Sequence, residues 1–242
     1  HQFEVHPIIE LPTVAGIDTS FTNASLWMVL AIGLSSLFLV AASRRTSIVP
    51  GRLQLMGEMS YSFVANMVKE NVGTEGMKYF PFIFSLFIFI LFCNMLGMLP
   101  YSFTVTSHLI VTFALAATVF LLVTLVGFAR HGVGFLKLFV PSGIPVVLLP
   151  LLVVIEVISY LTRPVSLSVR LFGNMMAGHT MLKIFGGFVV GLSSAGLIPL
   201  AIAPFALMVA FTGLELLIAG LQAYVFTILT CIYLNEAIHM DH

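Results

Sequence analysis

The chain has 242 residues, of which 60% are hydrophobic and only 8% carry a charge. Soluble domains are about half apolar and about a quarter charged, so this composition excludes an ordinary soluble protein and predicts a polytopic membrane protein. Ten basic residues balance ten acidic ones, which excludes a basic face for nucleic acid and an acidic tail for a cationic partner.

The first predicted transmembrane helix is the apolar run 26–42, which is long enough to cross the hydrocarbon core of a bilayer. Positive charges follow at Arg44, Arg45 and Arg52, and positive charge beside a span is typical of the cytoplasmic side. We therefore expect the amino terminus to face the periplasm or its equivalent.

Residues 53–68 are predicted to form a helix that lies at the membrane surface. Met56, Phe63 and Met67 recur at helical spacing, but polar residues interrupt the apolar pattern. This mixture favours an interfacial position over a membrane crossing.

Residues 80–129 are predicted to form a transmembrane hairpin with a tight connection at 100–106. Positive charges lie beyond both ends of the pair, for example Lys78 and Arg130. The hairpin is therefore expected to start and end on the cytoplasmic side.

Residues 145–236 are predicted to form a long helical hairpin. The stretch from 145 to about 190 is apolar, and a single helix of that length would extend about 67 Å, twice the hydrocarbon core. It either breaks near Pro164 into two spans or runs as one steeply tilted helix, and the residue pattern leaves both possibilities open. A Gly- and Ser-rich connection at 191–199 leads into the last run, and an even number of crossings here places the carboxyl terminus inside.

Taken together, these segments predict one all-α membrane domain, because the sequence contains no repeat, linker or low-complexity segment. Cys93 and Cys231 stand far apart in apolar runs and are interpreted as packing residues. No two of the seven histidines are spaced to share a helix face with a carboxylate or a thiol. We expect neither a metal nor a cofactor.

Arg170 is the strongest functional candidate. An ionisable group at bilayer depth costs about 2.5 to 3.5 kcal/mol, so it is expected to face protein or water and to be functional. A guanidinium keeps its charge at any biological pH, and no carboxylate lies within a turn or two. Ser166, Gly173 and Ala177 share its helical face, and small residues let another helix approach closely. The pattern predicts a contact surface with one fixed positive charge at its centre.

The alternative for Arg170 is a static salt bridge within the chain, to Glu156 or Glu215. Glu156, Arg163 and Arg170 recur every seven residues, which brings them close to one helical face. Spacing alone does not decide between the two interpretations.

His179 and Glu215 are the candidates for passing protons, because burial can bring the pKa of either side chain toward the operating pH. His179 is nine residues from Arg170, so the two lie on opposite sides of a helix and cannot serve the same small site. Glu215, Gln222 and Tyr233 form a second polar stripe on the last run. The alternative for His179 is a core histidine whose hydrogen bonds are satisfied.

Other polar residues in the apolar runs have plainer interpretations. Asn94 and Gln222 either line water or form hydrogen bonds between helices. Lys183, near the end of its run, is expected to extend to a membrane surface.

Three motifs make the chain resemble subunit a of the F-type ATP synthases. The most specific is SLSVRLFGNM at 166–175, followed by AGH at 177–179. NMLGMLP at 94–100 and LQAYVF at 221–226 are similar to the family's motifs in a hairpin span and in the last helix. The similarity covers most of the chain from Leu26 onward.

The resemblance implies a stator that carries protons past the rotor of a rotary ATP synthase. Its fold would comprise a first transmembrane helix, an interfacial helix, a transmembrane hairpin and a long tilted hairpin facing the rotor ring. Its partners would be the c-ring, peripheral-stalk b-type subunits and membrane lipid. The location would be the bacterial inner membrane, with the mitochondrial inner membrane as the alternative. ATP chemistry would belong to other subunits, since the sequence has no GxxxxGK[ST] loop.

The resemblance also implies roles for individual residues. Arg170 would attract the carboxylate of each passing c subunit and block a direct proton leak between two offset half-channels. The family pattern exchanges histidine and glutamate between the positions of His179 and Glu215, which supports their lying close together. The outer half-channel would contain His179, Glu215, Asn174 and Gln222. The inner half-channel would contain Glu156 and Ser166, and Tyr233 also stands at a family-like spacing. The small residues Ser166, Gly173 and Ala177 would face the rotor.

Two other functions compete with this one. A secondary transporter would bind a substrate between inverted repeats, and no repeat is detectable. A scaffold in a respiratory complex would use the charges as structural pairs and would tolerate Arg170→Lys. The choice between proton and sodium stays open, because the ion ligands of such a machine would lie mainly on the rotor ring.

Overall fold

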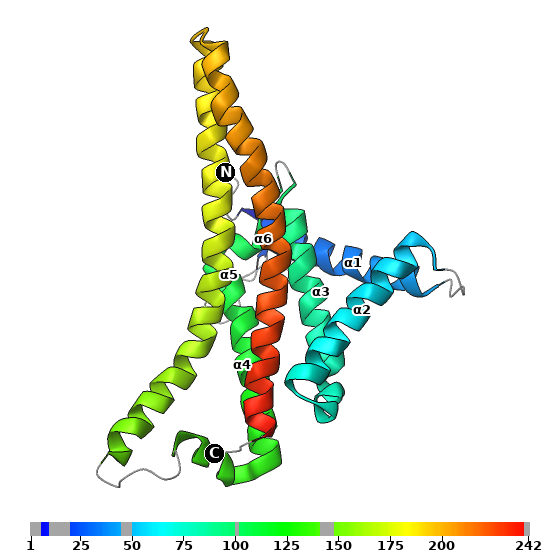
Figure 1. Cartoon of the computed structure of the whole chain (residues 1–242), viewed down its shortest axis with the longest axis vertical. Helices are drawn as coiled ribbons and strands as arrows, with labels where there is room; N and C mark the ends of the chain where they lie inside the picture. Colours follow the sequence, from blue (N-terminus) through cyan, green and yellow to red (C-terminus); the bar gives the residue numbers. More distant parts are fainter. Residues whose placement is uncertain (1–5, 10–19, 45–49, 100–101, 141–147, 240–242) are drawn as a thin grey trace. The chain divides into compact units, whose positions relative to one another are not determined.

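The computed structural model is almost entirely helical, which confirms the predicted all-α membrane class (Figure 1). It describes residues 6–9, 20–44, 50–99, 102–140 and 148–239. Arg45, Pro100 and the first residues of the predicted long hairpin, 145–147, lie outside these ranges. The short strands β1 (Pro7–Ile9) and β2 (Phe21–Thr22) pair antiparallel.

Five helical stretches of the described chain are long and apolar enough to cross a membrane, and α2 is not among them. The stretches contain α1, α3, α4, α5 and α6. In chain order the α-helices are α1 (Asn23–Ser43), α2 (Arg52–Asn71), α3 (Phe80–Gly97), α4 (Leu109–His131), α5 (Leu149–Ser194) and α6 (Ile198–Ile238). Three 3-10 helices connect them: η1 (Thr74–Tyr79), η2 (Val105–Ser107) and η3 (Gly132–Phe139).

Helix α5 decides between the two possibilities that the sequence left open. It continues through Pro164 as one helix of 46 residues, about 69 Å long. A proline removes one backbone hydrogen bond from the helix, here to the carbonyl of Tyr160. Membrane helices tolerate this loss because neighbouring groups satisfy the freed carbonyl. The chain therefore does not break into two helices at Pro164.

The chain divides into two units, each assembled from segments far apart in the sequence. The first unit comprises His1–Ser35, Phe89–His108 and Arg170–Ala223. The second comprises Ser36–Ile88, Leu109–Val169 and Tyr224–His242.

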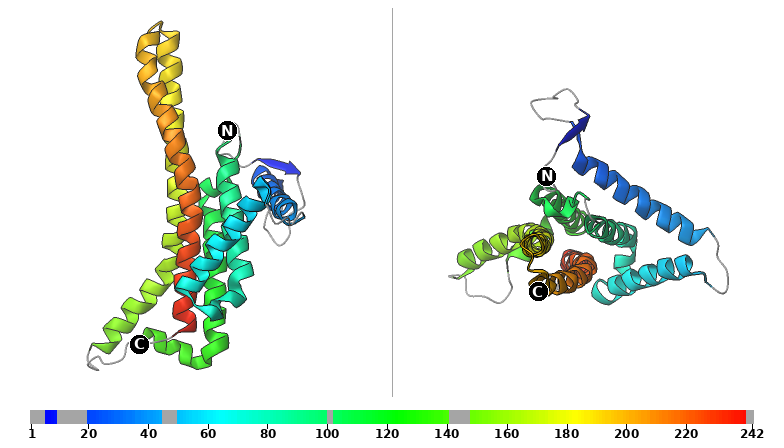
Figure 2. Two further views of the ribbon diagram at one scale, coloured as in Figure 1. Left: turned by 45° about the vertical axis from the view of Figure 1, so that its right-hand side comes forward. Right: turned by 90° about the horizontal axis from the view of Figure 1, so that it is seen from above.

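In the first unit, α5 and α6 run antiparallel side by side, yellow and orange in Figures 1 and 2. The turn between them contains Gly196 at a φ of 75°, a conformation that favours glycine. Phe185 of α5 stacks on Phe211 of α6, with ring centroids 5.2 Å apart. Asn94 of α3 donates a hydrogen bond of 3.1 Å to the carbonyl of Ala219 on α6. The end of α3 is thereby attached to the helical pair.

In the second unit, aromatic rings fill the contacts between helices. Tyr61 of α2 meets the edge of Phe80 of α3, with centroids 4.8 Å apart. Gly132 has a φ of 54° and reverses the chain after α4, so that Phe135 of η3 lies against Gly127. The ring of Phe135 is 1% exposed, which makes it one of the most buried large side chains.

Candidate functional site

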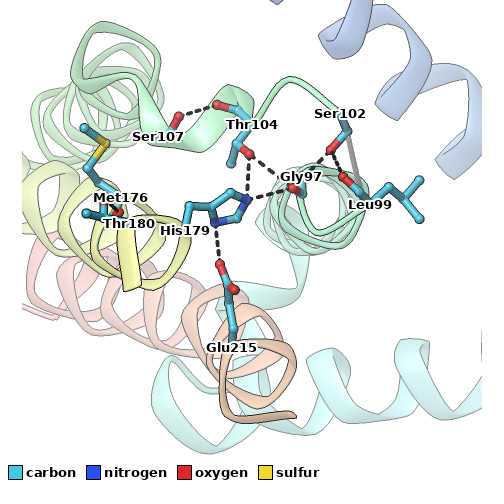
Figure 3. Close-up of polar contacts among 9 residues, drawn as sticks. All are labelled: Gly97, Leu99, Ser102, Thr104, Ser107, Met176, His179, Thr180 and Glu215. Carbon is cyan, nitrogen blue, oxygen red and sulfur yellow. Dashed lines mark hydrogen bonds and ion pairs between the residues drawn. The ribbon is translucent and has the colours of Figure 1, made fainter. Parts of the chain in front are cut away.

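A buried histidine and a buried glutamate meet between α5 and α6 in the first unit (Figure 3). Nδ1 of His179 contacts Oε1 of Glu215 within ion-pair distance. His179 is 6% exposed and Glu215 is 3% exposed. The structure thus brings together the two residues that the sequence indicated as proton carriers.

The opposite edge of the His179 ring faces the end of α3 and the connection that follows it (Figure 3). Nε2 lies 2.8 Å from Oγ1 of Thr104 and 2.8 Å from the carbonyl oxygen of Gly97. The Thr104 hydroxyl also donates to that carbonyl at 3.1 Å. Both ring nitrogens therefore have polar partners.

Gly178 lets the α6 carboxylate approach α5 this closely. A Cβ atom at this position would lie 2.9 Å from Oε1 and 3.0 Å from Cδ of Glu215. Any side chain there would displace the carboxylate from His179. In the AGH motif, the residue directly before His179 therefore has no side chain, which leaves room for the Glu215 carboxylate.

A cavity of about 200 Å³ lies beside the pair and is lined by Met98, His179, Leu182, Lys183 and Glu215. The cavity is large enough for several water molecules. Oε2 of Glu215 is buried and has no hydrogen-bond partner among the described residues. Lys183, expected to extend to a membrane surface, contributes to the cavity wall.

Three more predicted polar residues lie on α3, α5 and α6, with different surroundings. Gln222 is buried, two turns beyond Glu215 on α6, and Asn174 is exposed on α5. Asn94 is fully buried and bonds to the Ala219 carbonyl, so it forms the hydrogen bond between helices that was one of its two interpretations.

Arg170 is exposed on α5 and forms no ion pair among the described residues. Glu215, one of its two possible static partners, contacts His179 instead. On the Arg170 face, Ala177 is exposed and Gly173 is half-buried. The face therefore presents a cation among small residues.

The second unit holds the remaining candidates. Tyr233 lies on one side of the Arg163 guanidinium, 5.0 Å from it, and Tyr160 on another, at 5.2 Å. Arg163 also forms an ion pair with Glu236. Tyr233, predicted for the proton pathway, is thus part of a cation–π cluster. On α5, Glu156 is half-buried and Ser166 is exposed.

Sequence reasoning missed three of these partners. Thr104 and Gly97 contact His179 from 75 and 82 residues away, and Glu236 reaches Arg163 across 73. Gly97 lies in the NMLGMLP motif and Thr104 among the hydroxyl residues that are frequent at 102–107, but neither feature indicated a contact with His179. No cluster of three His, Cys, Asp or Glu side chains suited to a metal ion occurs in the part of the chain that the structure describes.

Comparison with known proteins gives one consistent result. The sequence model of the family described as ATP synthase A chain matches residues 24–235. The chain is 58% identical to ATP synthase subunit a of Parvibaculum lavamentivorans, over 100% of this chain and 94% of the relative. The same subunit of Pelagibacter ubique is 57% identical, over 100% of this chain and 98% of the relative. That of Rhizobium rhizogenes is 58% identical, over 99% of this chain and 96% of the relative. The chain therefore belongs to the ATP synthase subunit a family.

Proposed function

We propose that the chain is the proton-translocating stator subunit of a rotary F-type ATP synthase, with Arg170 separating two offset half-channels that reach the carboxylates of a c-ring. Membership of the ATP synthase subunit a family supports the part of this proposal that places the chain in an ATP synthase complex. The observation that carries the residue-level proposal is an exposed guanidinium, without an ion pair among the described residues, on a membrane-length apolar helix. Such a charge needs an anion from another chain.

On the outer side, a proton enters the cavity beside Glu215 and is taken up by the Glu215–His179 pair. Asn174 and Gln222 extend this path toward the rotor. The proton then neutralises a rotor carboxylate, which can turn into lipid because burying a neutral acid costs far less than burying a carboxylate. The burial of the pair and the adjoining cavity support this step.

On the inner side, Glu156 accepts the proton after the ring has turned, and the hydroxyl of Ser166 helps its release by hydrogen bonding. Tyr233 adjoins this path through Arg163. Arg170 attracts the deprotonated carboxylate and repels protons that would pass directly between the half-channels. A membrane potential supplies about 2.3 kcal/mol per charge per 100 mV, so each ATP needs several protons.

The small residues Ser166, Gly173 and Ala177 face the c-ring and let its helices pass closely. Peripheral-stalk b-type subunits and lipid cover other exposed apolar surfaces. The subunit lies in a bacterial inner membrane, with its amino terminus in the periplasm and its carboxyl terminus in the cytoplasm. ATP is made on other subunits of the complex.

Proton flux in vesicles that contain the assembled complex tests this function. Arg170→Ala and Arg170→Lys are expected to abolish coupled flux, because alanine has no charge and lysine lacks the planar, delocalised cation. The alanine variant is also expected to leak protons passively. Arg52→Ala, which removes an exposed arginine at the start of α2, is the control and should keep normal flux.

Unchanged coupled flux in both Arg170 variants would contradict the proposal and favour a scaffold. Loss of coupled flux without a passive leak in Arg170→Ala would keep Arg170 essential but remove its role as the barrier. Immunodetection of the subunit in the purified complex shows that each variant has assembled.

A further inference from the structure

We infer that Thr104 is a positioning residue of the proton pathway: its hydroxyl and the Gly97 carbonyl together give Nε2 of His179 a partner in either protonation state. This inference rests on the proposed function and deepens it. Thr104 lies in the connection between α3 and α4, outside every motif that indicated the family.

The geometry is a triangle of polar atoms. The Ser102 hydroxyl also lies 3.1 Å from the Gly97 oxygen, but it is closer, at 2.7 Å, to the Leu99 carbonyl. Nε2 of His179 is 2.8 Å from both Oγ1 of Thr104 and the oxygen of Gly97, and these two oxygens are 3.1 Å apart (Figure 3). Thr104 is fully buried, and Gly97 is buried as well. Gly97 is the last residue of α3, so its carbonyl is one of those that a helix leaves without an intrahelical donor.

The two oxygens suit two different states of the ring. A bare Nε2 is an acceptor, and only the Thr104 hydroxyl can donate to it. A protonated Nε2 is a donor, and the Gly97 carbonyl accepts from it while the hydroxyl rotates to donate to the same carbonyl. The ring can therefore change its protonation state without leaving Nε2 unsatisfied and without moving Nδ1 away from Glu215.

Thr104 acts through hydrogen bonding and not through charge. The titratable groups beside His179 in the cavity wall are Glu215 on α6 and Lys183 on α5. Gly97 and Thr104, from α3 and the connection, are uncharged. Replacing Thr104 thus changes the orientation and the hydrogen bonds of the His179 ring and leaves the neighbouring charges in place.

The direct test compares Thr104→Val with Thr104→Ser in the assembled complex. Valine keeps the shape but removes the donor, and we expect ATP-driven proton pumping to fall about tenfold, as for the loss of a hydrogen bond to a buried polar atom. Serine keeps the hydroxyl and should stay within about twofold of the unsubstituted protein. The dependence of flux on external pH should change with valine and not with serine.

Thr106→Val is the matched control. Thr106 is fully buried in the same connection, and its hydroxyl has no hydrogen-bond partner among the described residues. The same substitution there removes a hydroxyl that does not touch His179. Its flux and its pH profile should match those of the unsubstituted protein.

A second series tests the triangle from the Gly97 side. A Cβ atom at Gly97 would lie 2.8 Å from Cγ2 of Thr104, so Gly97→Ala should push the threonine off His179 and lower flux. Adding Thr104→Ser removes the methyl group that clashes most and keeps the hydroxyl, which should restore part of the flux; the remaining contacts, to Cβ and Oγ, are 3.3 Å. Adding Thr104→Val should not restore flux. If Thr104→Val alone does not assemble, the comparison of Gly97→Ala with Gly97→Ala/Thr104→Ser tests the role of the Thr104 hydroxyl instead.

Normal flux and pH profile in an assembled Thr104→Val complex would overturn the inference. A Thr104→Ser complex as defective as the valine variant would overturn it too, since the methyl group and not the hydroxyl would then matter. If Arg170→Ala abolishes flux in vesicles prepared in the same way, either of these two results contradicts only the role of Thr104 and not the proposed function. If Arg170→Ala also has no effect, the proposed function itself fails.

Discussion

The contact between His179 and Glu215 depends on a residue that contributes no side chain. Gly178 precedes the histidine on α5, and a Cβ atom there would come within 2.9 Å of the Glu215 carboxylate. A methyl group there would push the carboxylate out of its contact with His179, and the cavity beside Glu215 gives the displaced side chain somewhere to go. The glycine therefore sets the distance across which the pair acts.

Gly178→Ala should reduce ATP-driven proton pumping about tenfold or more, because displacing a reacting group by about 1 Å costs up to a hundredfold in rate. Gly187→Ala is the control, since a Cβ atom there meets nothing within 4 Å. Both changes improve helix propensity equally, so only the clash differs. Equal pumping in the two variants would show that the pair does not need its close contact.

The residues of the site differ in how far the sequence could predict them. Arg170, His179 and Glu215 stand out because an ionisable side chain in an apolar run is costly and therefore has a reason to be there. Thr104 and Gly97 carry no such cost, since neither has an ionisable side chain. Their role depends on the contact of the Gly97 carbonyl and the Thr104 hydroxyl with the ring of His179. Such a contact between residues far apart in the chain cannot be predicted from the spacing of side chains along the sequence.

At the scale of elements, hydropathy and charge predicted where the helices lie but not how their ends are held. The boundaries of α1 and α2 fall within a few residues of the predicted ones, because long apolar or amphipathic runs give strong patterns. The continuation of α5 through Pro164 was not decidable, since it depends on neighbouring groups. Likewise, no pattern indicated that η3 folds back on α4.

Gly127→Ala should loosen η3 from α4, because a Cβ atom there would lie 2.2 Å from Cε2 of Phe135. Overpacking of this kind costs about 1 to 3 kcal/mol, which should lower the temperature at which the subunit unfolds in the purified complex. The double variant Gly127→Ala/Phe135→Leu makes room for the methyl group and should recover part of the loss. Gly213→Ala, which meets no atom within 4 Å and gains helix propensity, should unfold at the same or a slightly higher temperature than the unsubstituted subunit. No recovery in the double variant would mean that the clash with Phe135 is not the cause.

For the molecule as a whole, the number of crossings fixes which side each terminus faces. The described chain has five helical stretches able to cross a membrane. If all five cross, the odd number puts the termini on opposite sides. The positive charges after α1 would then place the amino terminus on the periplasmic side and the carboxyl terminus on the cytoplasmic side, as proposed above.

Labelling with a membrane-impermeant maleimide tests this orientation. His6→Cys and His239→Cys place a thiol at an exposed position near each end. We expect His6→Cys to react in right-side-out vesicles and His239→Cys only in inverted ones. The unsubstituted protein is the control, because Cys93 is 2% exposed and Cys231 is 0% exposed, so neither thiol should react in either vesicle. Labelling of both variants from the same side would mean that the chain crosses an even number of times, and one of the five stretches would then have to lie along the membrane surface.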